Sequence, residues 1–144
     1  MATRTARTTW SGTVAEGNGQ VELVSSGIGT HDVSFPARAA DDAGGVTSPE
    51  ELIAAALSSC YAMQLSALIA EEGATPRTLD VTADVRLGPD PAGGFHIPGI
   101  ALTVRGTPEG LDEQAFVDVA TRAKETCPVS KALTVQISLD AALG

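Results

Sequence analysis

The sequence predicts an α+β fold in which most strands pair antiparallel. Its 144 residues suit one domain, 1–144, that is large enough to enclose a hydrophobic core. Segments with the alternating pattern of strands are grouped: three at the start, two in the middle and one after the second helical segment. Doubly wound parallel sheets instead alternate strands strictly with helices. We therefore expect three strands, a helix, two strands, a helix and a final strand.

The first three strands are expected to form a meander. Residues 5–14 and 20–25 are rich in Thr and Val, and the sequence Glu-Gly-Asn-Gly at 16–19 between them is a hairpin signal. A second glycine-containing turn leads into a third short strand near 31–36. Residues 37–47 are expected to form a loop.

A long central helix is expected from Ser48 to about residue 72. Ser48 is a good N-cap, Pro49 suits the first helical position, and Glu51 completes a capping box. Gly73 supplies the C-terminal stop. The nineteen residues 52–70 carry no formal charge, which is the length of a membrane span. Their serines and glutamine, and the acidic residues at both ends, favour a helix enclosed within a soluble protein.

The second half of the chain is expected to supply a strand pair, a helix and the last strand. Residues 78–88 alternate as in a half-buried strand, and 95–106 form its partner after a connection rich in Pro and Gly. Residues 111–126 have apolar positions at helical spacing and a charged outer face. The last strand is expected over 133–140.

The charge of the chain limits its partners. A net charge of −9 and a pI near 4.5 argue against nucleic acid, whose phosphates require basic patches, and against an anionic membrane surface. The N-terminal residues contain no apolar run of the kind that a secretory signal requires. We therefore expect no nucleic-acid partner, no membrane partner and a cytoplasmic location.

Cysteine occurs only twice, and both positions suggest thiol chemistry. Cys60 lies inside the uncharged part of the central helix, and Cys127 directly precedes Pro128 at the end of the second helix. In a reducing compartment two such cysteines are more often reactive than bridged. A buried, inert Cys60 and an inert Cys127 at a helix end are the alternative readings. The pre-proline position turns the Cys127 backbone away from helical geometry, so its side chain can approach another thiol.

Metal and cofactor sites are not expected. His31 and His96 stand apart, and neither has a cysteine at the spacing of a metal-binding motif. The glycine pairs near 17–19 and 27–29 lie in expected hairpins and do not precede a helix, so they are turn residues and not a phosphate-binding loop.

Three segments resemble the OsmC/Ohr family of thiol-dependent peroxidases. They are T-S-P-E-E-L-I-A-A-A-L-S-S-C-Y-A-M at 47–63, T-A-D-V at 82–85 and C-P-V-S-K-A-L at 127–133. The last of these is similar to the OsmC branch. The resemblance implies a single OsmC-like domain that forms an intertwined homodimer. It also implies reduction of organic hydroperoxides, with hydrogen peroxide as a second candidate substrate, in oxidative and osmotic stress defence. The reductant would be a dithiol, with a lipoyl protein as the candidate donor.

The resemblance also implies roles for four residues. Cys60 matches the peroxidatic cysteine, Cys127 the resolving cysteine, Glu50 the active-site glutamate and Arg38 the catalytic arginine. Ten residues of helix place Glu50 about 15 Å along the axis from Cys60, so the two cannot touch within one regular helix. Either Arg38 bridges part of the gap, or Glu50 serves Cys60 of the partner subunit. An apolar wall for an alkyl group is expected from Leu52, Ala56, Leu57 and Met63.

Two other classes of function remain open for the same cysteine pair. A non-enzymatic redox sensor or small-ligand-binding protein would use the pair as a switch and would stop after one equivalent of peroxide. A purely structural domain would lose no titratable thiol. Turnover with a dithiol therefore separates an enzyme from both alternatives.

Overall fold

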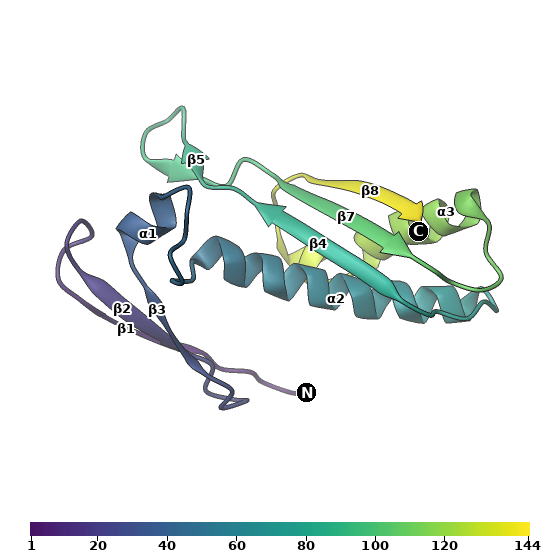
Figure 1. Ribbon diagram of the computed structural model, residues 1–144, viewed down its shortest axis with the longest axis horizontal. Helices are drawn as coiled ribbons and strands as arrows, with labels where there is room; N and C mark the ends of the chain where they lie inside the picture. Colours follow the sequence, from purple (N-terminus) through teal and green to yellow (C-terminus); the bar gives the residue numbers. More distant parts are fainter. The chain divides into compact units, whose positions relative to one another are not determined.

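The computed structural model describes residues 1–144, which divide into two compact units, Met1–Leu52 and Ile53–Gly144. The mixed α+β composition agrees with the predicted fold class (Figure 1). One helix, α2 (Pro49–Glu71), begins in the first unit and continues through the second.

The first unit contains the predicted three-strand meander. Strands β1 (Arg7–Ser11), β2 (Asn18–Glu22) and β3 (Thr30–Val33) form an antiparallel sheet in the order β1-β2-β3. Each strand is shorter than expected from the sequence, because the turn residues take up more of the chain than the Thr/Val pattern suggests.

A short helix, α1 (Phe35–Ala39), follows β3 where the end of a strand and a loop were expected. Its formation has a local cause: the Ser34 hydroxyl accepts a hydrogen bond from the Ala37 N–H at 3.3 Å, and Pro36 occupies the first turn. The expectation of a loop from residue 37 was therefore wrong at Arg38, which lies in the last turn of α1.

Helix α2 begins as predicted. The Ser48 hydroxyl accepts a hydrogen bond from the Glu51 N–H at 3.1 Å, which is half of the expected capping box. The Glu51 carboxylate accepts a hydrogen bond from the Thr47 hydroxyl instead of returning to the Ser48 N–H. Gly73, with φ of 78°, follows the last turn, as is usual at a helix C-terminus.

The second unit is a three-stranded sheet with two helices on one face. Strand β4 (Leu79–Val85) pairs antiparallel with β7 (Ile100–Gly106), as predicted. Strand β8 (Ile137–Leu143) pairs parallel with β7, whereas antiparallel pairing was expected. The reason is that α3 (Glu113–Thr126) and α4 (Pro128–Ala132) form a crossover between these strands, and a crossover returns the chain in the same direction.

Three further boundaries differ from the expectation. A two-stranded ribbon, β5 (Gly88–Pro89) and β6 (Phe95–His96), occupies the connection between β4 and β7, so the predicted strand 95–106 is interrupted. Helix α4 replaces the turn expected after Cys127-Pro128, and β8 begins four residues later than predicted. Pro128 favours α4 because proline suits the first helical position.

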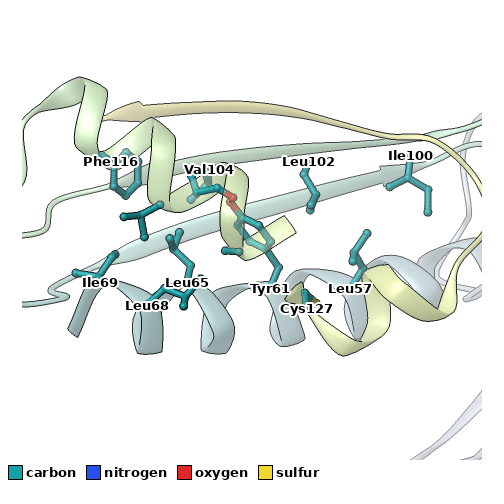
Figure 2. Close-up of a cluster of buried hydrophobic side chains, with 13 residues drawn as sticks. Leu57, Tyr61, Leu65, Leu68, Ile69, Ile100, Leu102, Val104, Phe116 and Cys127 are labelled. Atoms are coloured by element: carbon teal, nitrogen blue, oxygen red, sulfur yellow. The ribbon is translucent and has the colours of Figure 1, made fainter. Parts of the chain in front are cut away.

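The core of the second unit lies between α2, α3 and the sheet. Leu57, Tyr61 and Leu65 point from α2 toward β7, and the buried Tyr61 hydroxyl donates a hydrogen bond to the Ala120 carbonyl of α3 at 2.9 Å (Figure 2). By length and composition α2 is apolar enough to cross a membrane. These contacts instead make it a core helix. The core residues are Leu57, Tyr61, Leu65, Leu68, Ile69, Ile100, Leu102, Val104, Phe116, Val119, Ala120, Ala123 and Cys127.

Candidate active site

The fold of the second unit brings the two cysteines together, although they are 67 residues apart in the sequence. The Cys60 and Cys127 Sγ atoms lie 3.1 Å from each other, and both residues are free thiols. Cys60 projects from the middle of α2 and is partly exposed, whereas Cys127 is fully buried. A disulfide needs a sulfur separation of about 2.05 Å, so oxidation requires only a small movement of the two side chains.

Cys127 is held by its position between two helices. It is both the C-cap of α3 and the N-cap of α4, with φ of −61° and ψ of 124°. This extended conformation is the one that a following proline favours. The Cys127 N–H donates to the Ala123 carbonyl, and the Cys127 carbonyl accepts from the Lys131 N–H, so both backbone groups are fixed.

The two thiols differ in acidity. Burial and the adjacent Cys127 raise the pKa of Cys60, against a smaller lowering by the Val129 N–H. Burial also raises the pKa of Cys127, but the Ser130 N–H, the Cys60 thiol and the Ser130 hydroxyl lower it more. Cys127 is therefore the more acidic thiol of the pair. No cation is among the groups that act on Cys60, so its activation requires a charge from elsewhere.

Such a charge exists in the first unit, where Arg38 and Glu50 form a close ion pair. The Arg38 Nε lies 3.1 and 3.0 Å from the two Glu50 oxygens, and its Nη2 lies 2.6 Å from Oε1. Helix α1 supplies the arginine and the first turn of α2 supplies the glutamate. Two donors on two oxygens give the bidentate geometry expected for such a pair.

The pair is charged at neutral pH. Burial raises the pKa of Glu50, which is 6% exposed, but the hydrogen bonds from Arg38 and from its own backbone lower it more. The Glu50 carboxylate raises the pKa of Arg38 in return. Only the carboxylate is enclosed, since the Arg38 side chain keeps 31% of its surface exposed. The guanidinium therefore retains surface for a second partner.

An apolar cavity of about 410 Å³ lies beside Arg38 within the first unit. Its lining residues are Thr8, Trp10, Val14, Val21, Val33, Ser34, Phe35, Arg38, Pro49 and Leu52. Of the expected apolar wall only Leu52 lines this cavity. Leu57 lies in the core of the second unit, and Met63 is 70% exposed. The expectation for Leu57 was wrong, because the helical pattern alone does not show which face meets the core. For the exposed Met63, which was expected to act together with partner residues, it stays a prediction.

Sequence reasoning missed the two aromatic residues of the cavity wall and a serine beside Cys127. Trp10 and Phe35, two of only five aromatic residues in the chain, line the cavity, and this scarcity was the available signal. Ser130 lies in the first turn of α4 beside Cys127, and the Cys-Pro-x-Ser pattern was its signal. The four expected site residues form two pairs, Cys60 with Cys127 and Arg38 with Glu50, and α2 carries one member of each.

Comparisons with known proteins show the family to which the chain belongs. The family model described as "OsmC-like protein" matches residues 41–141. Peroxiredoxin OsmC of Escherichia coli (strain K12) is 39% identical over 131 residues, which cover 91% of this chain and 90% of that protein.

Two solved structures share the fold. An organic hydroperoxide resistance protein from Elizabethkingia anophelis superposes with a TM-score of 0.79 at 26% identity, covering 100% of this chain and 98% of that one. The organic hydroperoxide resistance protein OhrB of Bacillus subtilis gives 0.72 at 27% identity, covering 97% and 98%. In sequence and in fold, this chain is a member of the OsmC family.

Proposed function

We propose that this protein is a thiol-dependent peroxidase that reduces organic hydroperoxides, with hydrogen peroxide as a second candidate substrate. The observation that carries this proposal is the pair of free thiols, Cys60 and Cys127, with sulfur atoms 3.1 Å apart. The names of its relatives, a peroxiredoxin and organic hydroperoxide resistance proteins, support the same chemistry.

The reaction follows from the two thiols. The Cys60 thiolate attacks the distal peroxide oxygen, the O–O bond breaks, and the alcohol leaves with a proton, so Cys60 becomes a sulfenic acid. The Cys127 thiolate then attacks the Cys60 sulfur, water is released, and a disulfide forms. Because Cys127 is the more acidic thiol, it is well suited to this second step. A dithiol reduces the disulfide by exchange.

Arg38 and Glu50 would activate the first step. A guanidinium beside the Cys60 sulfur would stabilise the thiolate and polarise the bound peroxide. Glu50 holds that guanidinium by two charge-assisted hydrogen bonds, which fix its plane. The apolar cavity next to Arg38 would accept the organic group of the peroxide, with Trp10 and Phe35 in its wall.

We further propose a homodimer in which Arg38 and Glu50 of one subunit serve Cys60 of the partner subunit. Helix α2 carries an uncharged exposed stripe at a spacing of four residues: Ala55, Ser59, Met63 and Ala67. An apolar face of this kind on a core helix favours contact with another protein surface, and small residues allow close approach. Glu50 and Cys60 are about 15 Å apart along the axis of α2, so a partner subunit offers a shorter route between them.

The proposed dimer contact can be tested by a substitution at Met63. Changing Met63 to Lys should convert the protein to monomers and lower peroxidase activity, because a buried lysine at the interface would be unpaired. Thr82, which is exposed on the outer face of β4, provides the control, and Thr82→Lys should leave the dimer intact. Light scattering after size-exclusion chromatography measures the molecular mass of both variants. A dimeric Met63→Lys protein would contradict the proposed contact.

Several finer parts of the proposal follow from the chemistry. The two compact units would act as one domain, 1–144, which the match of the Elizabethkingia structure to 100% of this chain supports. A reducing compartment, the cytoplasm, would keep the dithiol reductant available, and a lipoyl protein is the candidate donor. The physiological role would be oxidative and osmotic stress defence.

Changing Cys127 to Ser should permit one turnover and then inactivate the enzyme. Without the resolving thiol the Cys60 sulfenic acid persists, and further peroxide converts it to sulfinic acid. The measurement is cumene hydroperoxide consumption with excess dithiol, followed by intact mass. Wild type should consume many equivalents, and the variant about two: one that forms the sulfenic acid and one that forms the sulfinic acid, for a gain of two oxygen atoms. If wild type stops after one equivalent, the protein is a sensor, the alternative that uses the same thiols.

A further inference from the structure

Ser130 is a buried hydroxyl beside the two cysteines with no hydrogen-bond partner. The residue is 8% exposed, and its Oγ makes no hydrogen bond. Most buried polar groups are paired, since an unpaired one costs stability. The unpaired Ser130 hydroxyl therefore calls for an explanation, and the reduction of the disulfide described so far does not use it.

Ser130 occupies a helix position from which a side chain can reach Cys127. Cys127 is the N-cap of α4, and Ser130, three residues later, is the third residue of that helix. A side chain at this position reaches back to the N-cap residue, as it does in a capping box. The electrostatics agree with this placement: burial raises the pKa of the Cys127 thiol, and the Ser130 N–H and hydroxyl lower it.

The exposure of the two sulfur atoms adds an independent argument. Cys127 is fully buried, whereas Cys60 is partly exposed. A thiol that reduces the disulfide must reach the sulfur atom that it attacks, and the other sulfur atom must leave as a thiolate. The greater exposure of Cys60 favours attack on its sulfur atom. The groups that lower the pKa of Cys127 favour the departure of the Cys127 sulfur as a thiolate.

We propose that Ser130 is a positioning residue whose hydroxyl donates a hydrogen bond to the departing Cys127 sulfur, so that the reductant attacks the Cys60 sulfur of the disulfide. This inference rests on the proposed function only in requiring that a Cys60–Cys127 disulfide forms. It assigns which sulfur atom the reductant attacks and which one leaves. It also gives the unpaired Ser130 hydroxyl a hydrogen-bond partner once Cys127 is a thiolate.

Reduction of the disulfide takes two successive exchange reactions. One thiolate of the dithiol forms a bond to Cys60 Sγ, the bond between the two cysteine sulfur atoms breaks, and its electron pair stays on Cys127 as a thiolate. Ser130 donates to that thiolate until a proton arrives from solvent. The second thiolate of the reductant then attacks its own mixed disulfide, Cys60 leaves, and the dithiol has been oxidised to a disulfide.

The first test locates the mixed disulfide. The protein is oxidised with diamide, which makes the disulfide without peroxide, and is then treated with less than one equivalent of glutathione. After acid quenching and alkylation, peptide mass spectrometry should find glutathione on Cys60 at least about fivefold more often than on Cys127. Equal labelling, or a preference for Cys127, would overturn the proposal.

The second test removes the hydroxyl. Ser130→Ala should slow glutathione exchange about threefold, because the pKa of the leaving Cys127 thiol rises when the Ser130 hydroxyl is lost. Ser130→Thr keeps the hydroxyl and should restore the rate. In a Cys60→Ala background, where Cys127 is the only thiol, thiolate absorbance should show the same upward shift of pKa with Ser130→Ala and its recovery with Ser130→Thr.

Thermal unfolding separates this role from a structural one. Reduced Ser130→Ala should unfold at the same temperature as wild type or higher, since the hydroxyl has no hydrogen bond to lose. A lower unfolding temperature with an unchanged exchange rate would mean that Ser130 is structural and would refute the proposal. Diamide forms the disulfide without peroxide, so these tests do not depend on peroxidase activity. A protein that does not react with peroxide would therefore refute the peroxidase function and leave this inference to be decided by the exchange tests.

Discussion

Replacing Cys60 by Ser should lower hydroperoxide consumption by roughly 10³-fold or more, to the background rate, because the reacting nucleophile is removed. A serine hydroxyl does not ionise near neutral pH, and it cannot pass through a sulfenic acid. Cys127 remains in this variant but is fully buried, so peroxide has no accessible sulfur to meet. The measurement is steady-state cumene hydroperoxide consumption with excess dithiol.

Matched variants make this result specific. Thr82, which is exposed on β4 outside the proposed dimer contact, provides the control, and Thr82→Ala should keep wild-type activity. Cys60→Ala serves as a second variant, since it avoids placing a hydroxyl beside the core. Circular dichroism should show that each variant is folded. Activity in a folded Cys60→Ser protein would refute the assignment of the reacting thiol.

The sequence predicted the elements whose signals are local. The start and end of α2 follow from Ser48, Pro49 and Gly73, and the N-terminal meander follows from its hairpin turn. The parallel pairing of β8 with β7 was not predicted, because it depends on the path of the α3–α4 crossover. The short helices α1 and α4 were missed for a different reason: each contains only five residues, too few for a hydrophobic period.

For the site residues, too, the sequence identified the residues but not their contacts. Cys60 and Cys127 could be chosen from their positions in the sequence, but their contact depends on how α3 packs against α2. Arg38 was chosen by family resemblance and placed on the wrong element, since Ser34 and Pro36 start a helix that the strand pattern concealed. Ser130 was overlooked because the Cys-Pro-x-Ser pattern does not show that its hydroxyl is buried beside Cys127.

The acidity of the two thiols shows why Arg38 matters. Within this chain burial raises the pKa of Cys60, and only the Val129 N–H opposes it. At neutral pH such a thiol is mostly protonated and is a poor nucleophile. If Cys60 is the peroxidatic cysteine, it depends on a cation in this environment, and the proposed function assigns that part to the charged Arg38–Glu50 pair.

Changing Arg38 to Ala should lower kcat/KM by about 10²- to 10³-fold at neutral pH, because both the thiolate and the developing oxyanion lose their stabilising charge. The remaining activity should rise with pH toward and beyond 9.0, the ordinary thiol value, since the pKa of Cys60 then stays raised. Wild type should level off at lower pH. Arg38→Lys should recover only part of the loss, because lysine cannot form the bidentate pair with Glu50.

Mixed dimers show which subunit supplies that charge. Co-expression of differently tagged Arg38→Ala and Cys60→Ser chains yields heterodimers in which each subunit has one defect. If Arg38 serves Cys60 of the partner subunit, one site has both defects, the other has none, and the heterodimer should keep about half of the wild-type activity. If Arg38 serves its own subunit, both sites are defective and activity should be as low as in Arg38→Ala. The second result would exclude the proposed exchange between subunits and leave Arg38 to bridge toward Cys60 within one chain.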